Sequence, residues 1–120
     1  MDTKTGLHAL EYARMAVDVA SDKQASDIVM LDIRGVSDFS DYFVILTAES
    51  DRQLNSLASD IGEALKGNGA VRHHIEGSTH GGWILMDFGD VIVHLFRPDE
   101  RDFYQLEEIW STGIESVRIQ

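Results

Sequence analysis

Four short segments of this chain are made almost wholly of apolar residues, and each has the length of a β-strand. They span residues 28–33, 42–46, 83–88 and 91–96. Strands with one solvated face alternate apolar and polar residues, whereas a near-continuous apolar run indicates a strand that is covered on both faces. We therefore expect an α/β fold, in which helices pack against the faces of a sheet.

Two amphipathic segments are suited to cover that sheet. Residues 3–23 carry apolar side chains at intervals of three and four, which predicts a helix. A second helix is predicted after Ser50, because Ser50 and Gln53 have the spacing of a capping box. This helix should end near Gly67, since glycine tolerates the left-handed conformation that ends helices.

A last helix is predicted from Pro98, because proline suits the first turn of a helix. With a weaker strand candidate at 70–76, the predicted order is α-β-β-α-β-β-β-α. We expect a mixed five-stranded sheet flanked by helices, in one domain over residues 1–120. The buried face of the last helix would be formed by Phe103, Leu106 and Trp110.

The chain is strongly acidic. It has 10 Lys+Arg against 21 Asp+Glu, a formal net charge of −11, and its basic residues are scattered. Nucleic-acid binding relies on clustered basic residues, so we do not expect nucleic acid to be the main contact. The acidic charge either favours a basic partner or only maintains solubility, and the charge alone leaves both explanations open. The chain has no cysteine, no apolar run long enough for a membrane helix and no signal-peptide pattern at its start. We expect a soluble, cytoplasmic protein without membrane contact.

Asp38 with Asp41, and Asp87 with Asp90, are the two acidic pairs available for a magnesium site, since nucleotidyl transfer uses paired acids to hold two metal ions. No Asp-x-Asp motif occurs in any predicted strand. Gly89 and Asp90 separate two apolar runs, which predicts a hairpin turn of type I′ or II′, and aspartate commonly serves such turns. We therefore expect no catalysis and no cofactor. The alternative is a small nucleotidyltransferase-like enzyme that uses Asp87 and Asp90 with magnesium.

Several histidines are candidate metal ligands by residue type. His73, His74, Glu76 and His80 lie close together in the sequence. Neighbouring residues of a strand point to opposite faces, so His73 and His74 cannot readily join one site, and we expect no metal. His94 lies within an apolar run and is expected to be a hydrogen-bonded core residue.

Trp83 opens a predicted strand beside a glycine-rich loop. Tryptophan is enriched among the hot spots of protein interfaces and is also common in cores, and both roles remain open on residue type alone. Several strings, in order and spacing, resemble the ribosomal silencing factor family, also called the Iojap-like family. The resemblance covers about residues 7–110. It is carried by LDIRG at 31–35, DYFVI at 41–45, SDRQ at 50–53, EG at 76–77, WILMDFGDVIVHLF at 83–96, RDFYQLE at 101–107 and IW at 109–110.

The resemblance implies a non-enzymatic factor that binds the free large ribosomal subunit through large-subunit protein fourteen. The bound factor would occupy space that the small subunit needs, so that the subunits cannot join and translation is repressed when nutrients are limiting. It also implies a fold similar to the nucleotidyltransferases, frequent homodimers, and no catalytic residue, metal or cofactor. The implied contact residues are Trp83, Ile84, Leu85, Met86, Asp87 and Asp90.

The sequence departs from the family pattern at a few positions. Glu49 and Asp51 replace the usual small residues before the second predicted helix, and Phe103 stands where tyrosine is frequent. Residues 111–120 follow no family pattern. None of these positions lies in the strand that opens with Trp83, so the docking expectation stands.

Overall fold

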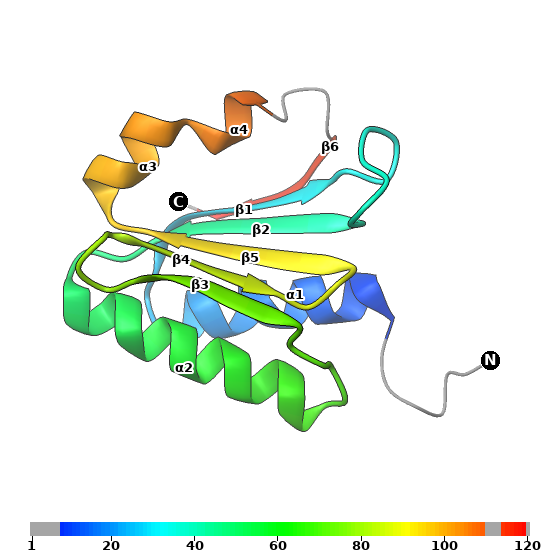
Figure 1. The fold of residues 1–120 in the computed structure, drawn as a ribbon, viewed down its shortest axis with the longest axis horizontal. Helices are drawn as coiled ribbons and strands as arrows, with labels where there is room; N and C mark the ends of the chain where they lie inside the picture. Colours follow the sequence, from blue (N-terminus) through cyan, green and yellow to red (C-terminus); the bar gives the residue numbers. More distant parts are fainter. Residues whose placement is uncertain (1–7, 110–113, 120) are drawn as a thin grey trace.

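The computed structural model describes residues 8–109 and 114–119, and its central element is a six-stranded mixed sheet (Figure 1). The strands lie in the order β3-β4-β5-β2-β1-β6. In the described part of the chain, no helix has both the length and the apolar character needed to cross a membrane. The elements are α1 (Ala9–Asp22), β1 (Ser26–Asp32), β2 (Tyr42–Thr47), α2 (Asp51–Gly67), β3 (His74–Ser78), β4 (Trp83–Asp87), β5 (Val91–Phe96), α3 (Pro98–Tyr104), α4 (Leu106–Ile109) and β6 (Ile114–Ile119).

The strands β2 and β5 form the centre of the sheet and are its parallel pair, with Tyr42 opposite Val91. The other four pairings are antiparallel. Every residue of β2 and β5 is buried, as their near-continuous apolar sequences predict. In β4, by contrast, buried and half-buried residues alternate, so the prediction of two-sided burial is wrong for this strand. The mixed sheet and the α/β class are confirmed.

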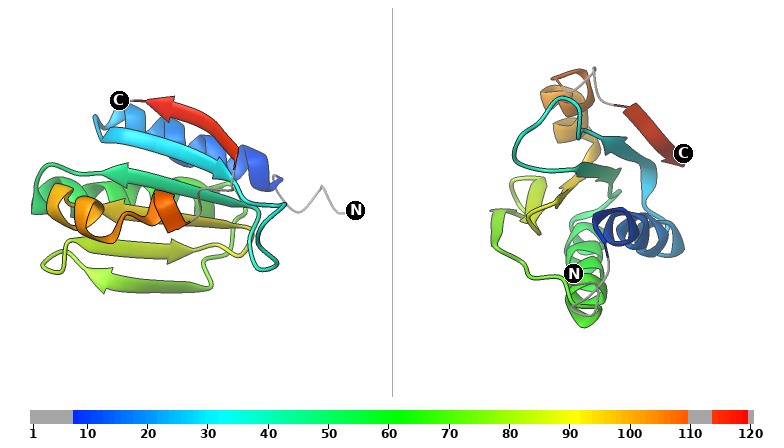
Figure 2. Two further views of the ribbon diagram at one scale, coloured as in Figure 1. Left: turned by 90° about the horizontal axis from the view of Figure 1, so that it is seen from above. Right: turned by 90° about the vertical axis from the view of Figure 1, so that its right-hand side faces the viewer.

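The helices α1 and α2 cover one face of the sheet, and α3 and α4 lie on the other (Figure 2). The α2 cap is as predicted at Ser50, whose Oγ accepts a hydrogen bond from the Gln53 backbone N–H at 3.0 Å. The Gln53 side chain reaches one residue further back than a capping box requires and accepts from the Glu49 N–H. Its Nε2 also donates to the carbonyls of Lys23 and Gln24, so the start of α2 is tied to the end of α1.

The sheet has one more strand than the sequence predicts. β6 pairs antiparallel with β1 and forms one edge of the sheet. Its sequence, Ile-Glu-Ser-Val-Arg-Ile, mixes apolar, polar and charged residues and lacks the continuous apolar run of a doubly covered strand. The five-strand count is therefore wrong, because an edge strand is held by its backbone partner and does not need an apolar pattern. At the opposite edge, β3 begins at His74, four residues after the start of the predicted segment 70–76, and ends at Ser78.

The predicted last helix is broken into α3 and α4. Gln105 adopts a left-handed backbone conformation, with a φ of 46°, and ends α3. Leu106 is buried against the sheet, as predicted. The prediction for Phe103 is wrong: its side chain is 79% exposed, because the break at Gln105 separates the helical face that carries Leu106 from the one that carries Phe103. Trp110 and residues 3–7 of the first predicted helix lie outside the described residues.

Candidate functional site

The strand β4 presents its residues alternately to the two faces of the sheet. Trp83, Leu85 and Asp87 are half-buried on the face that carries α3. Ile84 and Met86 are 5% and 0% exposed, and they belong to the core beneath α1 and α2. These two residues cannot contact a partner in this structure, because the two-residue period of a strand turns them into the core. The contact surface expected on this strand is therefore restricted to its other three residues.

The Trp83 side chain lies in a cluster of rings. Its indole stacks on Phe96, with centroids 4.9 Å apart and an interplanar angle of 28°. It also contacts Tyr104 of α3 at 4.6 Å. The indole Nε1–H donates a hydrogen bond to Nδ1 of His94 at 3.3 Å. Trp83 therefore packs against the core and keeps part of its surface accessible, which is compatible with either of the roles left open by the sequence.

The ring contacts continue across the sheet in what we call the aromatic row. Its members, in spatial order, are Phe39, Phe43, His94, Trp83, Tyr104 and Phe103. Each ring centroid lies between 4.6 and 6.3 Å from the next. The row is buried at His94 and exposed at its two ends, where Phe39 and Phe103 are 59% and 79% exposed. Phe39 was not identified from the sequence, because a single phenylalanine in a polar loop carries no pattern.

A shallow pocket of about 120 Å³ opens beside Trp83 and is lined by Glu76, Gly77, Trp83 and Leu85. Gly77 has a positive φ of 89°, and a Cβ atom at this position would collide with the backbone carbonyl of Trp83. Only glycine lets β3 approach β4 this closely. The sheet is uncovered over β3 and β4 on this face (Figure 2), and every residue of β3 is exposed.

Asp87 and Asp90 both take part in the turn between β4 and β5. The Asp87 carboxylate accepts a hydrogen bond from the Gly89 N–H at 2.7 Å, and Gly89 has a φ of 84°. The Asp90 carbonyl accepts from the N–H groups of Asp41 and Tyr42, while its own side chain is exposed. Partial burial, followed by the charge of Asp90, raises the pKa of Asp41. The predicted turn at Gly89 and Asp90 is confirmed by the hydrogen bond from the Phe88 N–H to the Val91 carbonyl. Asp87 stabilises this turn through its carboxylate, and Asp90 lies in it.

The histidine-rich region does not assemble a metal site. His74 and Glu76 lie on the same face of β3, and their side chains pair with a His74 Nε2 to Glu76 Oε2 distance of 2.7 Å. The His73 ring instead lies close to Gly89 in the β4–β5 turn. Among the described residues, no three His, Cys, Asp or Glu side chains are gathered closely enough to hold a metal ion.

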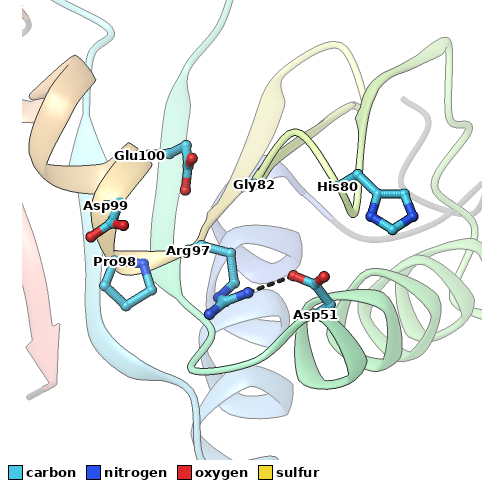
Figure 3. A pocket seen from close by; sticks show the side chains of 7 residues that line it. All are labelled: Asp51, His80, Gly82, Arg97, Pro98, Asp99 and Glu100. Carbon is cyan, nitrogen blue, oxygen red and sulfur yellow. Dashed lines mark hydrogen bonds and ion pairs between the residues drawn. The ribbon is translucent and has the colours of Figure 1, made fainter.

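A second, polar pocket of about 320 Å³ lies where α2, α3 and the β3–β4 turn meet (Figure 3). In this pocket Arg97 forms an ion pair with Asp51, the first residue of α2. Three of the other lining side chains are titratable, and no sequence pattern marks this combination, because its residues come from separate elements. The residues that line it are Asp51, His80, Gly82, Arg97, Pro98, Asp99 and Glu100.

The fold and the site together define a small mixed α/β protein whose partly open sheet face carries aromatic and acidic side chains. The chain belongs to the ribosomal silencing factor family: the family model described as "Ribosomal silencing factor during starvation" matches residues 7–120. The match includes the tail that forms β6 and therefore extends beyond the stretch that carries the sequence resemblance.

Individual relatives agree with this assignment. The chain is 40% identical over 97 residues to the ribosomal silencing factor of Bacillus subtilis, covering 81% of this chain and 82% of that protein. It is 30% identical over 100 residues to a Mus musculus protein named "Mitochondrial assembly of ribosomal large subunit protein 1", covering 81% of this chain and 44% of that protein. A crystal structure of a Chromobacterium violaceum protein is 31% identical and superimposes with a TM-score of 0.83, covering 88% of each chain.

Proposed function

We propose that this chain silences ribosomes by binding the large ribosomal subunit through large-subunit protein fourteen. The bound protein would occupy the space that the small subunit needs, so that the subunits cannot join and translation is repressed under nutrient limitation. Membership of the ribosomal silencing factor family supports the silencing role. The partner and the block of subunit joining are carried over from the sequence resemblance.

The observation that carries the proposal is the open sheet face over β3 and β4. It offers the half-buried side chains of Trp83 and Leu85 around a shallow pocket, with Glu76 at the rim. Tryptophan in such a setting is the preferred anchor of a protein interface. Docking through half-buried apolar side chains beside an acid is suited to a protein surface and not to a phosphate backbone.

The charge of the chain supports a basic protein partner. The net charge is −11, and two arginines of α3 and its N-cap are already paired, Arg97 with Asp51 and Arg101 with Glu107. An acidic surface attracts a basic protein patch and repels the ribosomal RNA around it. The same surface therefore favours the partner and disfavours its surroundings.

The proposed action is steric and needs no reaction. Of the two acids of the alternative enzyme, Asp87 accepts a hydrogen bond within the β4–β5 turn, and Asp90 bonds through its backbone carbonyl while its side chain is exposed. We propose that the chain is not an enzyme and acts in the cytoplasm. Homodimer formation, the similarity to the nucleotidyltransferase fold and the single-domain organisation over residues 1–120 stay predictions.

Co-sedimentation with purified large ribosomal subunits tests the proposal. Wild type should sediment with the subunits and reduce their joining to small subunits. Leu85→Ala should weaken the interaction, and Trp83→Ala should weaken it by a factor of about 30 or more, as expected for a hot-spot anchor. Ile75→Ala is the matched control, because Ile75 is an exposed apolar residue of the same region that pairs with Met86 and therefore points to the other face.

The folded state of each variant is checked by circular dichroism. A folded Trp83→Ala protein that sediments like wild type would place the interface elsewhere. Wild-type protein that sediments with the subunits but leaves subunit joining unchanged would refute the steric block and keep the binding.

A further inference from the structure

His94 lies directly beneath the proposed docking surface. Its side chain is 4% exposed, and it sits on β5 opposite Leu85. Its Nδ1 accepts the hydrogen bond from the Trp83 indole, so Nδ1 is unprotonated. The neutral imidazole then carries its proton on Nε2. That Nε2 atom is buried and has no hydrogen-bond partner among the described residues.

We propose that His94 is a positioning residue that holds the Trp83 indole in the orientation used for docking. The inference rests on the proposed function, since it assigns a role within the same surface. It concerns the free protein: the indole is fixed before any partner arrives, and the partner meets a prearranged anchor.

The contacts of Trp83 explain why one hydrogen bond matters. Stacking on Phe96 and the contact with Tyr104 hold the plane of the indole. Aromatic pairs tolerate a range of offsets, so these contacts fix the position of the indole N–H less sharply than its plane. The bond from Nε1 to His94 is directional and selects one orientation. An anchor that is already ordered loses less conformational entropy on binding.

Stability alone does not account for a histidine at this position. The His94 ring is surrounded by aromatic rings, with Phe43 at 4.9 Å, Trp83 at 6.0 Å and Phe96 at 6.3 Å. A buried nitrogen without a partner is destabilising. A phenylalanine would fill the same space without that cost, and what it would lack is the acceptor for the indole.

The substitution His94→Phe tests the proposal, because it removes the acceptor and keeps an aromatic ring. The variant should unfold at the same or a higher denaturant concentration than wild type. The indole N–H resonance of Trp83, identified by its absence in Trp83→Phe, should shift in the free protein. Binding to isolated large-subunit protein fourteen should weaken by about fivefold to tenfold, the effect of one net hydrogen bond. His94→Asn, which places an acceptor near the position of Nδ1, should recover most of the affinity.

A double-mutant cycle separates positioning from a general structural effect. In a Trp83→Phe background the indole donor is gone, so adding His94→Phe should cause no further loss of affinity. An unshifted indole resonance, unchanged affinity in the single variant, or an equal loss in both backgrounds would overturn the proposal. If wild type does not bind protein fourteen, the proposed partner is wrong, and the indole resonance of the free proteins still decides whether His94 holds the ring.

Discussion

Arg101 donates two hydrogen bonds to the carboxylate of Glu107, from Nε at 2.9 Å and from a terminal nitrogen at 2.7 Å. The two residues lie on either side of the break at which α3 ends and α4 begins. Arg101 is buried and also donates to the hydroxyl of Thr47 in β2 at 2.8 Å. Asp27 of β1 lies 3.5 Å from the same guanidinium. This pair therefore fastens the broken C-terminal helix to the centre of the sheet.

Glu107→Gln should destabilise the protein by about 1–3 kcal/mol, because the buried guanidinium of Arg101 loses the carboxylate that accepts two of its hydrogen bonds and retains Asp27, at 3.5 Å, as a more distant charged partner. Urea unfolding at neutral pH measures the loss. Lys23→Gln is the control, since Lys23 and Asp60 form an exposed ion pair of the kind that contributes about 0–1 kcal/mol. Equal stability of Glu107→Gln and wild type would show that the break is held by apolar packing alone.

Glu107 also predicts an acid-dependent loss of stability. Burial raises its pKa, but hydrogen bonds and charge from Arg101, aided by Arg118, outweigh this and lower the pKa below its usual 4.5. Because the folded-state pKa is depressed, the stabilisation is present above pH 4.5 and is lost as the pH falls through the folded value. Wild type should lose this contribution in that range, and Glu107→Gln should not.

His94 predicts a loss of stability at a higher pH. Burial lowers its pKa from 6.5 to about 3. Between these values the unfolded chain binds a proton that the folded chain excludes, so stability is full above about pH 6.5 and falls as the pH decreases. From pH 7.5 to 5.5 wild type should lose about 1 kcal/mol more than His94→Phe, by urea unfolding at both pH values. Parallel pH profiles of the two proteins would contradict a buried neutral His94.

Gly77 predicts a backbone requirement beside the docking surface. Gly77→Ala should destabilise the protein by about 1–3 kcal/mol, because alanine disfavours the positive φ and its Cβ meets the Trp83 carbonyl. Gly67→Ala is the matched control: Gly67 is the last residue of α2, with no atom within 4 Å of an added Cβ. That control should stabilise the helix by about 0.5–1 kcal/mol. Thermal unfolding of both variants makes the comparison, and a neutral Gly77→Ala would mean that β3 moves freely away from β4.

The parts of the fold that follow from local pattern were predicted from the sequence. β5 has the predicted bounds, β2 ends one residue later than predicted, and α2 begins directly after Ser50. The break at Gln105 was not predicted, because a left-handed glutamine carries no local signal and is imposed by the packing of Leu106 and the pairing of Arg101. β6 was missed for a related reason, since an edge strand is specified by its neighbour β1.

The candidate site was predicted in its sequence position and only partly in its geometry. Trp83 and the burial of His94 follow from residue type and the surrounding apolar run. The hydrogen bond between them joins residues on two strands and depends on the register that places Trp83 opposite Phe96. Ile84 and Met86 are among the contact residues that the resemblance implies, but their side chains are buried in the core, because side chains alternate between the two faces of a strand.

The two acids of the β4–β5 turn should differ in their effect on stability. Asp87→Ala removes the acceptor for the Gly89 N–H and should cost about 1 kcal/mol. Asp90→Asn should leave stability within about 0.5 kcal/mol of wild type, because Asp90 acts through its backbone carbonyl and its side chain is exposed.

Wild type should show no magnesium-dependent nucleotide binding by calorimetry. Such binding in wild type, lost in Asp90→Asn, would support the alternative enzyme.

The net charge of −11 predicts that association with the basic partner is accelerated by electrostatic attraction. Attraction between exposed charges is screened beyond about 8 Å at physiological ionic strength. Salt should therefore slow association with isolated large-subunit protein fourteen. The dissociation rate depends on the short-range contacts of Trp83 and Leu85 with the partner. It should therefore change less with salt than the association rate.

Stopped-flow or surface-based kinetics across a salt series measures both rates. Glu76→Gln, at the rim of the pocket, should lower the association rate at low salt and have a smaller effect at high salt. Lys23→Gln makes the net charge more negative at an exposed site at the end of α1 and serves as the opposite control. Protein-free ribosomal RNA should not bind, because an acidic surface cannot displace the cations that neutralise the RNA phosphates. An association rate that is independent of salt, or tighter binding to the RNA than to protein fourteen, would refute the role of charge in choosing the partner.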